Sequence, residues 1–138
     1  MILLVEDDPD HEALAIRALR KANVANEIEV ARDGAEALAY VAAAASGAKP
    51  MPQLVLLDLK LPKVDGLQVL RSIRAEEKTA LLPVVVLTSS DEERDIVSSY
   101  RLGVNSYIRK PVNFTDFAEA TRQLGMYWLL LNQCPPPQ

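Results

Sequence analysis

The feature that most constrains the fold is a short apolar run that recurs along the chain, each time followed by polar residues and a helix-like stretch. Runs such as Ile2–Val5 are wholly apolar, as in strands that are buried on both faces. Because each pair of parallel strands needs a right-handed crossover, strands that alternate with helices predict a parallel sheet with helices on both faces. Strands are expected at 2–5, 28–30, 54–57, 84–87 and 107–108.

These βα units predict an α/β protein with a flavodoxin-like, doubly wound (βα)5 fold. Its five-stranded parallel sheet is expected in the order 2-1-3-4-5. The expected helix starts agree with this interpretation. Pro9 behind Asp8 fits the first turn of a capped helix. Ser90 and Glu93 form a capping box, and Asn113 can cap the last helix.

The composition limits the chain to one folded domain. A length of 138 residues with 49% hydrophobic side chains supports one core, which we expect within residues 1–125. Residues 126–138 are expected to form a helix extension and a proline-rich tail, with no output domain. A net charge of −4 argues against nucleic-acid binding. The apolar runs are far shorter than the roughly 20 residues of a membrane span, and the single Cys134 without a leader pattern fits a cytoplasmic protein.

Polar residues follow the predicted strands where each strand ends. The carboxyl ends of parallel strands meet at one edge of a sheet, and ligands bind there. Glu6, Asp7 and Asp58 should therefore lie together, and clustered carboxylates repel one another unless a cation lies among them. Hard oxygen ligands favour Mg²⁺. Because an Asp carboxylate can be a phosphoryl nucleophile, we expect phosphoryl chemistry at Asp58, with Lys110 and Thr88 as partners.

A set of residues in this order resembles the receiver domain of response regulators in two-component signalling. The resemblance extends to about residue 125. The set consists of Glu6 and Asp7 after the first strand, Asp58, Pro62 and Gly66 after the third, Thr88 after the fourth, and Lys110 and Pro111 after the fifth.

The resemblance implies a role for each of these positions. Asp58 would be the phosphoacceptor, and Asp7, Asp58 and the backbone carbonyl of Lys60 would bind Mg²⁺, while Glu6 would act largely through bound water.

Thr88 and Lys110 would hold the phosphoryl oxygens. Tyr107 would be the aromatic switch residue that moves together with Thr88. The bond between Lys110 and Pro111 would be a cis peptide bond, which X-Pro pairs permit.

The same resemblance implies partners. A histidine kinase would donate the phosphoryl group, and a downstream protein would read the response. The chain would catalyse only its own phosphorylation and dephosphorylation. The connector at 42–52, rich in Ala and Pro, and the Tyr-Trp-Leu-rich tail are similar to stand-alone receivers that serve bacterial, especially cyanobacterial, phytochrome kinases. Fast-decaying relatives carry an acid or amide where this chain has Lys60 and Ser90, which predicts a comparatively long-lived phosphorylated state.

Two other functions compete with this hypothesis. A haloacid dehalogenase-type phosphatase would need a second Asp two residues after the nucleophile, where Lys60 stands. A receiver-like module that senses by contact alone would not need the acidic set. Asp8 and Asp65 are interpreted as helix caps, and His11 is assigned no chemistry.

The C-terminal segment suggests self-association. Its residues 126–131 are apolar all round, although a helix on a sheet should bury only one stripe. An exposed apolar patch on such a protein marks an interaction site. We therefore expect a homodimer, with Tyr127, Trp128, Leu130 and Leu131 as interface candidates.

Overall fold

The structure, a computed structural model, describes residues 1–21, 27–61, 63–88, 103–104, 106–110 and 112–123. Strands and helices alternate along these residues as the sequence predicts, up to the end of the fourth strand. In chain order the elements are β1 (Ile2–Val5), α1 (Pro9–Lys21), β2 (Ile28–Ala31), α2 (Gly34–Ala45), β3 (Leu54–Asp58), α3 (Gly66–Ala75), β4 (Val84–Thr88), β5 (Ser106–Arg109) and α5 (Phe114–Gln123).

The five strands form one parallel sheet in the order β2-β1-β3-β4-β5, which confirms the predicted fold class and strand order. In the register, Val5 pairs with Leu57 and Asp58 pairs with Leu87. The central strands β1, β3 and β4 therefore end nearly level with one another. Whatever follows them in the chain is brought to one edge of the sheet.

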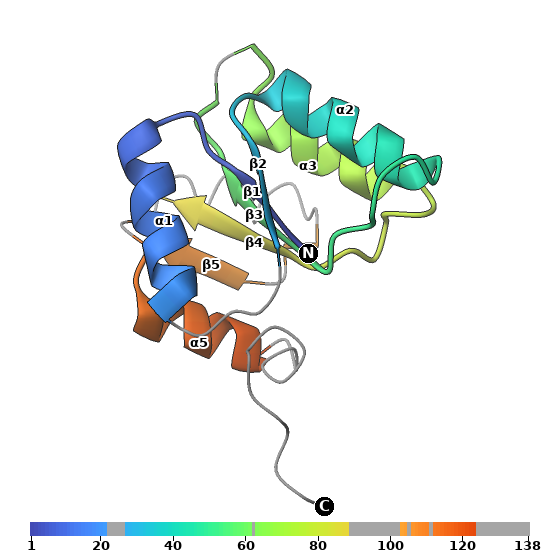
Figure 1. The fold of residues 1–138 in the computed structure, drawn as a ribbon. Coiled ribbons are helices and arrows are strands. Elements are labelled where there is room, and N and C mark those ends of the chain that lie inside the picture. The colour runs from blue at the N-terminus through green and yellow to red at the C-terminus, as the bar shows by residue number, and fades with distance from the viewer. Residues whose placement is uncertain (22–26, 62, 89–102, 105, 111, 124–138) are drawn as a thin grey trace, which may run out of the picture.

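Helices cover both faces of the sheet (Figure 1). Helices α1 and α5 lie on one face, and α2 and α3 lie on the other. Alternate residues of β1 enter the two cores, because successive side chains of a strand point to opposite faces. Leu4 packs in the cluster that contains Leu19 and Phe117, whereas Leu3 packs in the cluster that contains Ile73.

Polar side chains cap four of the described helices, and three of these caps, Asp8, Asp65 and Asn113, were expected from the sequence. Oδ1 of Asp8 accepts a hydrogen bond from a backbone N–H of the first turn of α1 at 2.8 Å. Asp33, Asp65 and Asn113 do the same for α2, α3 and α5, at 2.8, 2.9 and 2.9 Å respectively. The predicted capping box at Ser90 lies outside the described residues.

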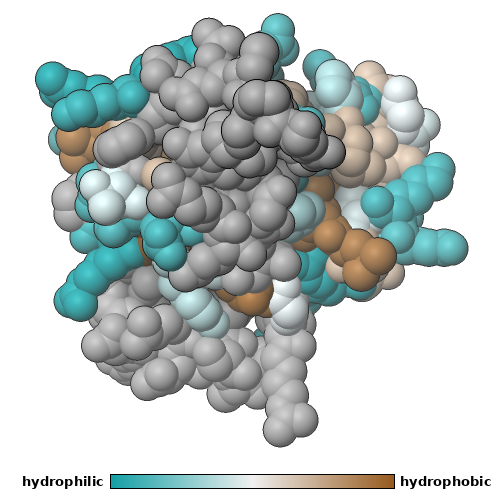
Figure 2. All heavy atoms as spheres, turned by 90° about the horizontal axis from the view of Figure 1, so that it is seen from below, coloured by the Kyte–Doolittle hydropathy of each residue, from teal (hydrophilic) through white to brown (hydrophobic). Residues whose placement is uncertain are grey.

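Large apolar side chains at the surface are scattered. In the described part of the chain, the exposed ones are Leu14, Met51 and Leu81. Leu14 therefore lies outside the core, although it belongs to α1. Figure 2 shows one face, on which hydrophilic side chains project around the margin and apolar atoms occur in several separate places. None of the described helices combines the length and apolar character needed to cross a bilayer.

Candidate functional site

Three carboxylates gather at the carboxyl edge of the sheet. Glu6 and Asp7 come directly after β1, and Asp58 is the last residue of β3. Because β1 and β3 are neighbours in register, the three side chains converge, and one oxygen of each lies within 4.8 Å of the others. Glu6 and Asp58 are buried, at 1% and 4% exposure, whereas Asp7 is exposed. The site is therefore an acidic pocket with one open side.

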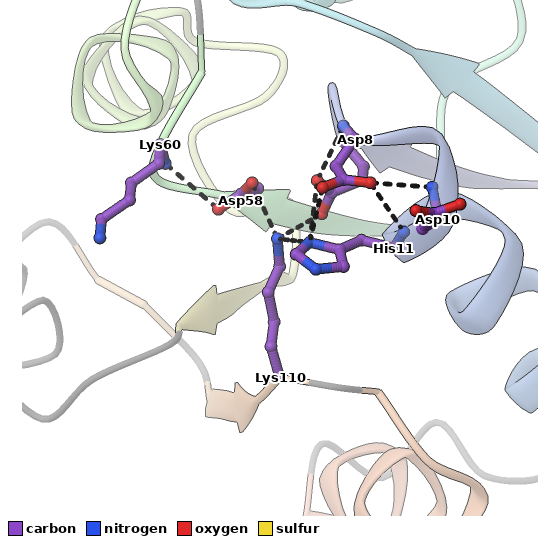
Figure 3. Close-up of polar contacts among 7 residues, drawn as sticks. Asp8, Asp10, His11, Asp58, Lys60 and Lys110 are labelled. Carbon is purple, nitrogen blue, oxygen red and sulfur yellow. Dashed lines mark hydrogen bonds and ion pairs between the residues drawn. The ribbon is translucent and has the colours of Figure 1, made fainter.

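Lys110 brings a positive charge into this pocket. It follows β5, and its side chain reaches across the end of β4 toward the carboxylates (Figure 3). Its Nζ lies 2.9 Å from Oδ2 of Asp58 and 2.7 Å from Oε2 of Glu6. Only 11% of the Lys110 side chain is exposed. An ammonium group at these distances compensates much of the repulsion between the two buried carboxylates.

Burial and close contact shift the pKa values of Glu6 and Lys110. Burial raises the pKa of Glu6, and the neighbouring Asp58 adds to the rise, although the contact with Lys110 opposes it. Burial on its own would lower the pKa of Lys110, but its contacts with Glu6 and Asp58 outweigh that effect and raise the pKa. Lys110 is thus an ammonium group at neutral pH, and the pocket stabilises a positive charge.

The loop after β3 is held against Asp58. The backbone N–H of Lys60 donates to Oδ1 of Asp58 at 3.2 Å, while the Lys60 side chain points away from the cluster (Figure 3). The N–H of Gly66 donates to the carbonyl of Leu59 at 3.0 Å. A Cβ at Gly66 would collide with the backbone carbonyl of Asp58, so only glycine permits α3 to begin this close to the acidic residue.

The pocket fits a divalent cation. Oε2 of Glu6 is buried, and among the described residues it makes an ion pair with Nζ of Lys110 at 2.7 Å but no contact with hydrogen-bond geometry. The candidate ligands are carboxylate oxygens, the donors that Mg²⁺ and Mn²⁺ prefer. Because Asp7 is exposed, one side of the cluster remains accessible to water or to phosphate oxygens.

The other predicted site residues are placed to different degrees. Thr88 ends β4 at the same edge, one position beyond the partner of Asp58 in the register. Tyr107 lies in β5 and packs, partly buried, against the core on the α2 and α3 side. Pro111 and its predicted cis bond lie outside the described residues. The same holds for the predicted interface residues Tyr127, Trp128, Leu130 and Leu131.

His11 lies at the site, a place that its sequence context did not predict. Its Nδ1 lies 3.0 Å from Nζ of Lys110. The one signal in the sequence was its place in the first turn of a helix that starts at the acidic edge. Nothing in the local pattern points to Lys110, which is 99 positions away.

Comparison with known proteins points to one family. The family profile described as the response regulator receiver domain matches residues 2–122. The chain is 42% identical over 137 residues to the probable methanogenesis regulatory protein FilR2 of Methanothrix harundinacea, which covers 99% of this chain and 88% of that protein. It is 38% identical over 130 residues to the response regulator Rcp1 of Synechocystis, with 94% and 88% covered.

Solved structures share the fold over almost the whole chain. The bacteriophytochrome response regulator AtBRR superposes with a TM-score of 0.86 at 51% identity and 96% coverage of both chains. The Mn²⁺-bound form of Rcp1 gives 0.72 at 36% identity, covering 99% of this chain and 98% of that one. The phosphorylated cyanobacterial phytochrome response regulator RcpA gives 0.73 at 39% identity, with 98% and 97% covered.

Proposed function

Because the chain belongs to the response regulator receiver domain family, we propose that Asp58 accepts a phosphoryl group from a phosphohistidine of a partner histidine kinase. The observation that carries this proposal is the buried carboxylate of Asp58 beside the Lys110 ammonium, 2.9 Å away. A buried carboxylate has few waters to displace before it attacks. The phosphorylated relative RcpA supports the proposal.

The reaction is a phosphoryl transfer between two side chains. One Asp58 oxygen forms a bond to phosphorus, the phosphorus–nitrogen bond to the kinase histidine breaks, and the electron pair of that bond returns to the imidazole. Negative charge lies on the three equatorial oxygens throughout. Lys110 holds one of these oxygens through its ammonium group, and the Thr88 hydroxyl binds another.

Glu6, Asp7 and Asp58, together with the backbone carbonyl of Lys60, would hold Mg²⁺ in this scheme. The bound ion would neutralise charge on the phosphoryl oxygens as they approach the carboxylates. The buried oxygen of Glu6, which makes an ion pair with Lys110 but no hydrogen bond, and the Mn²⁺-bound relative Rcp1 support this assignment. Lys110 then has to share the two carboxylates of Glu6 and Asp58 with the metal.

The response to phosphorylation is proposed to arise at the surface formed by β4, β5 and α5. Thr88 and Tyr107 are the proposed switch residues, since Thr88 ends β4 at the site and Tyr107 lies in the adjacent strand. A second protein, or a second copy of this chain, would read the change. In this proposal residues 1–125 act as the receiver domain in the cytoplasm, and residues 126–138 provide a surface for association.

Labelling with acetyl phosphate tests the phosphoacceptor. We expect Mg²⁺-dependent incorporation of one phosphoryl group, lost in Asp58→Asn and in excess chelator. Asp65→Asn is a matched control, because Asp65 is an exposed helix cap outside the cluster. Undiminished labelling of Asp58→Asn would refute the proposal, and an unlabelled wild-type protein that still binds its partner would favour sensing by contact.

The proposed kinase is a bacterial phytochrome, since the similar proteins AtBRR and RcpA are a bacteriophytochrome response regulator and a cyanobacterial phytochrome response regulator. Transfer from an autophosphorylated phytochrome kinase should be faster than transfer from a histidine kinase with another sensor. Equal rates from both kinases would contradict this partner assignment while leaving the phosphoacceptor assignment intact.

A further inference from the structure

Three groups surround the ammonium of Lys110. Two of them, Glu6 and Asp58, are the carboxylates of the acidic pocket. The third is the imidazole of His11, whose Nδ1 lies 3.0 Å from Nζ. An ammonium group has three N–H bonds. The contacts with Asp58 and His11 have hydrogen-bond geometry, and Glu6 is the third close neighbour, through an ion pair.

The protonation of the histidine follows from its partner. An ammonium group donates and cannot accept, so Nδ1 of His11 must carry a lone pair, and the ring proton lies on Nε2. Lysine is ordinarily an ammonium group at neutral pH, and Lys110 lies beside two carboxylates, which stabilise its positive charge. A lone pair engaged in this way is not available to a metal ion, which separates His11 from the carboxylate cluster.

The imidazole is held in place from several sides. The backbone N–H of His11 donates to Oδ1 of Asp8 in the first turn of α1. Its Nδ1 also lies 3.8 Å from Oε1 of Glu6 and 3.8 Å from Oδ2 of Asp8. The side chains of Leu14 and Val112 line the small depression that His11, Glu6 and Lys110 share. The ring therefore has a defined place beside the pocket.

We propose that His11 is a positioning residue for Lys110, whose Nδ1 takes the third N–H of the ammonium group and so directs the other two toward the pocket. The consequence for phosphoryl transfer rests on the proposed function. Lys110 has a long, flexible side chain, and without this acceptor the ammonium would rotate among water and the two carboxylates. A fixed donor is better placed to receive a phosphoryl oxygen at the pocket.

A measurement on the unphosphorylated, metal-free protein tests the contact directly. At about pH 8, above the usual His pKa near 6.5, long-range ¹H–¹⁵N spectra should show the Nε2–H tautomer of His11. The Lys110 ammonium signal should be protected from exchange in wild type and in His11→Asn, whose Oδ1 stands near the place of Nδ1. It should broaden or vanish in His11→Leu. An Nδ1–H tautomer, or equal ammonium signals in all three proteins, would overturn the proposal.

Phosphorylation rates test the consequence. With Mg²⁺ and acetyl phosphate, His11→Leu should react about tenfold more slowly, the effect of losing one hydrogen bond to a charged group. His11→Asn should recover most of that loss. The His11 side chain is 43% exposed, so leucine is accommodated without disturbing the core. A wild-type rate in His11→Leu would refute a positioning role, whereas no reaction in wild type itself would refute the proposed function and leave the spectra to decide on His11.

Discussion

At the scale of single residues, the site is governed by the balance of charge around Glu6 and Asp58. Two buried carboxylates this close repel each other by several kcal/mol at intermediate dielectric, on the order of 4 kcal/mol at 4 Å. Lys110 contacts both of them and offsets most of this repulsion. The same arrangement suits a metal ion or a phosphoryl group. A cation would neutralise part of the carboxylate charge, and the oxygens of a phosphoryl group would be further acceptors for the Lys110 ammonium.

The residue two positions after Asp58 should set the lifetime of the phosphorylated state. Lys60 is anchored through its backbone to Asp58, and its side chain points away from the cluster (Figure 3). Lys60→Asn would place an amide where it can orient water. We expect the aspartyl phosphate to decay about tenfold faster, less than the roughly 10²–10⁴ of a well-placed general base. Decay is followed after removal of acetyl phosphate, with the remote Lys49→Asn as control. An unchanged decay rate in Lys60→Asn would contradict the predicted role.

Asp33 should make stability depend on pH at the acidic end. Its pKa lies below the usual value of 3.8, mainly because the Glu36 N–H donates to it and also because Lys63 lies 3.2 Å away. A lowered folded-state pKa stabilises the fold above the unfolded value, and the contribution is lost as pH falls through the folded value. Asp33→Asn keeps the cap acceptor but loses the charge. It should be less stable than wild type near neutral pH, and the difference should shrink below about pH 4.

Urea unfolding of both proteins across this pH range measures the difference. Glu77→Gln removes one exposed negative charge elsewhere and serves as the control. A difference between wild type and Asp33→Asn that stays constant with pH would show that the charge of Asp33 plays no part.

At the scale of elements, Arg74 connects three segments. Its Nη1 donates to the carbonyls of Ala80 and Leu82, and its Nη2 donates to the carbonyl of Gly103, at 3.1, 2.7 and 2.7 Å. Helix α3 is thereby joined to the turn before β4 and to the residues before β5. Gly103 has a φ of +66°, a conformation that glycine adopts without strain, and it turns its carbonyl toward the guanidinium.

Replacing Arg74 with methionine should loosen these connections. Met keeps an apolar stem of similar length but leaves the three carbonyls without their donor. Because hydrogen bonds to charged groups contribute about 1.5–3 kcal/mol each and the contacts share one partly exposed group, we expect a loss of about 2–3 kcal/mol in the free energy of unfolding. Urea denaturation measures it, with the exposed Arg17→Met as control. A loss no larger than that of Arg17→Met would show that the carbonyls are equally well served by water.

The elements that the sequence predicts well are those with a local signature. Doubly buried strands such as β3 read as uninterrupted apolar runs, and caps such as Asp65 stand at a fixed offset from the N–H that they accept. The contact of His11 with Lys110 joins residues 99 positions apart, and no local pattern encodes it. The positive φ of 67° at Lys63 is equally hidden, because a lysine gives no signal for the left-handed region. Such features depend on tertiary packing.

At the scale of the whole molecule, Lys110 links the acidic pocket to the α5 side of the protein. Its ammonium group contacts Glu6 after β1 and Asp58 at the end of β3, and it also contacts His11 of α1. Two positions after it, Val112 is buried in the core that also contains Phe117 of α5. A displacement of Lys110 toward a phosphoryl group would therefore pull on the connection between β5 and α5.

We predict that the protein forms a twofold dimer through the segment that follows α5. Phe117 is fully buried, so the α5 stripe that faces the sheet is already in use within this chain. The sequence then continues with a run rich in apolar residues, among them Tyr127, Trp128, Leu130 and Leu131. One self-complementary patch satisfies both subunits and closes the assembly, and aromatic residues are enriched among binding hot spots.

Analytical ultracentrifugation should find a dimer at micromolar concentration that weakens at least about tenfold when Leu130 and Leu131 are both changed to Ser, as expected for the loss of hot-spot contacts. Leu81→Ser is the matched control, since Leu81 is a highly exposed leucine in the turn between α3 and β4. Sedimentation with and without a phosphoryl analogue reports the effect of phosphorylation, whose sign depends on which state of the β5–α5 connection matches the interface. A wild-type protein that sediments as a monomer at high micromolar concentration in both conditions would contradict the dimer.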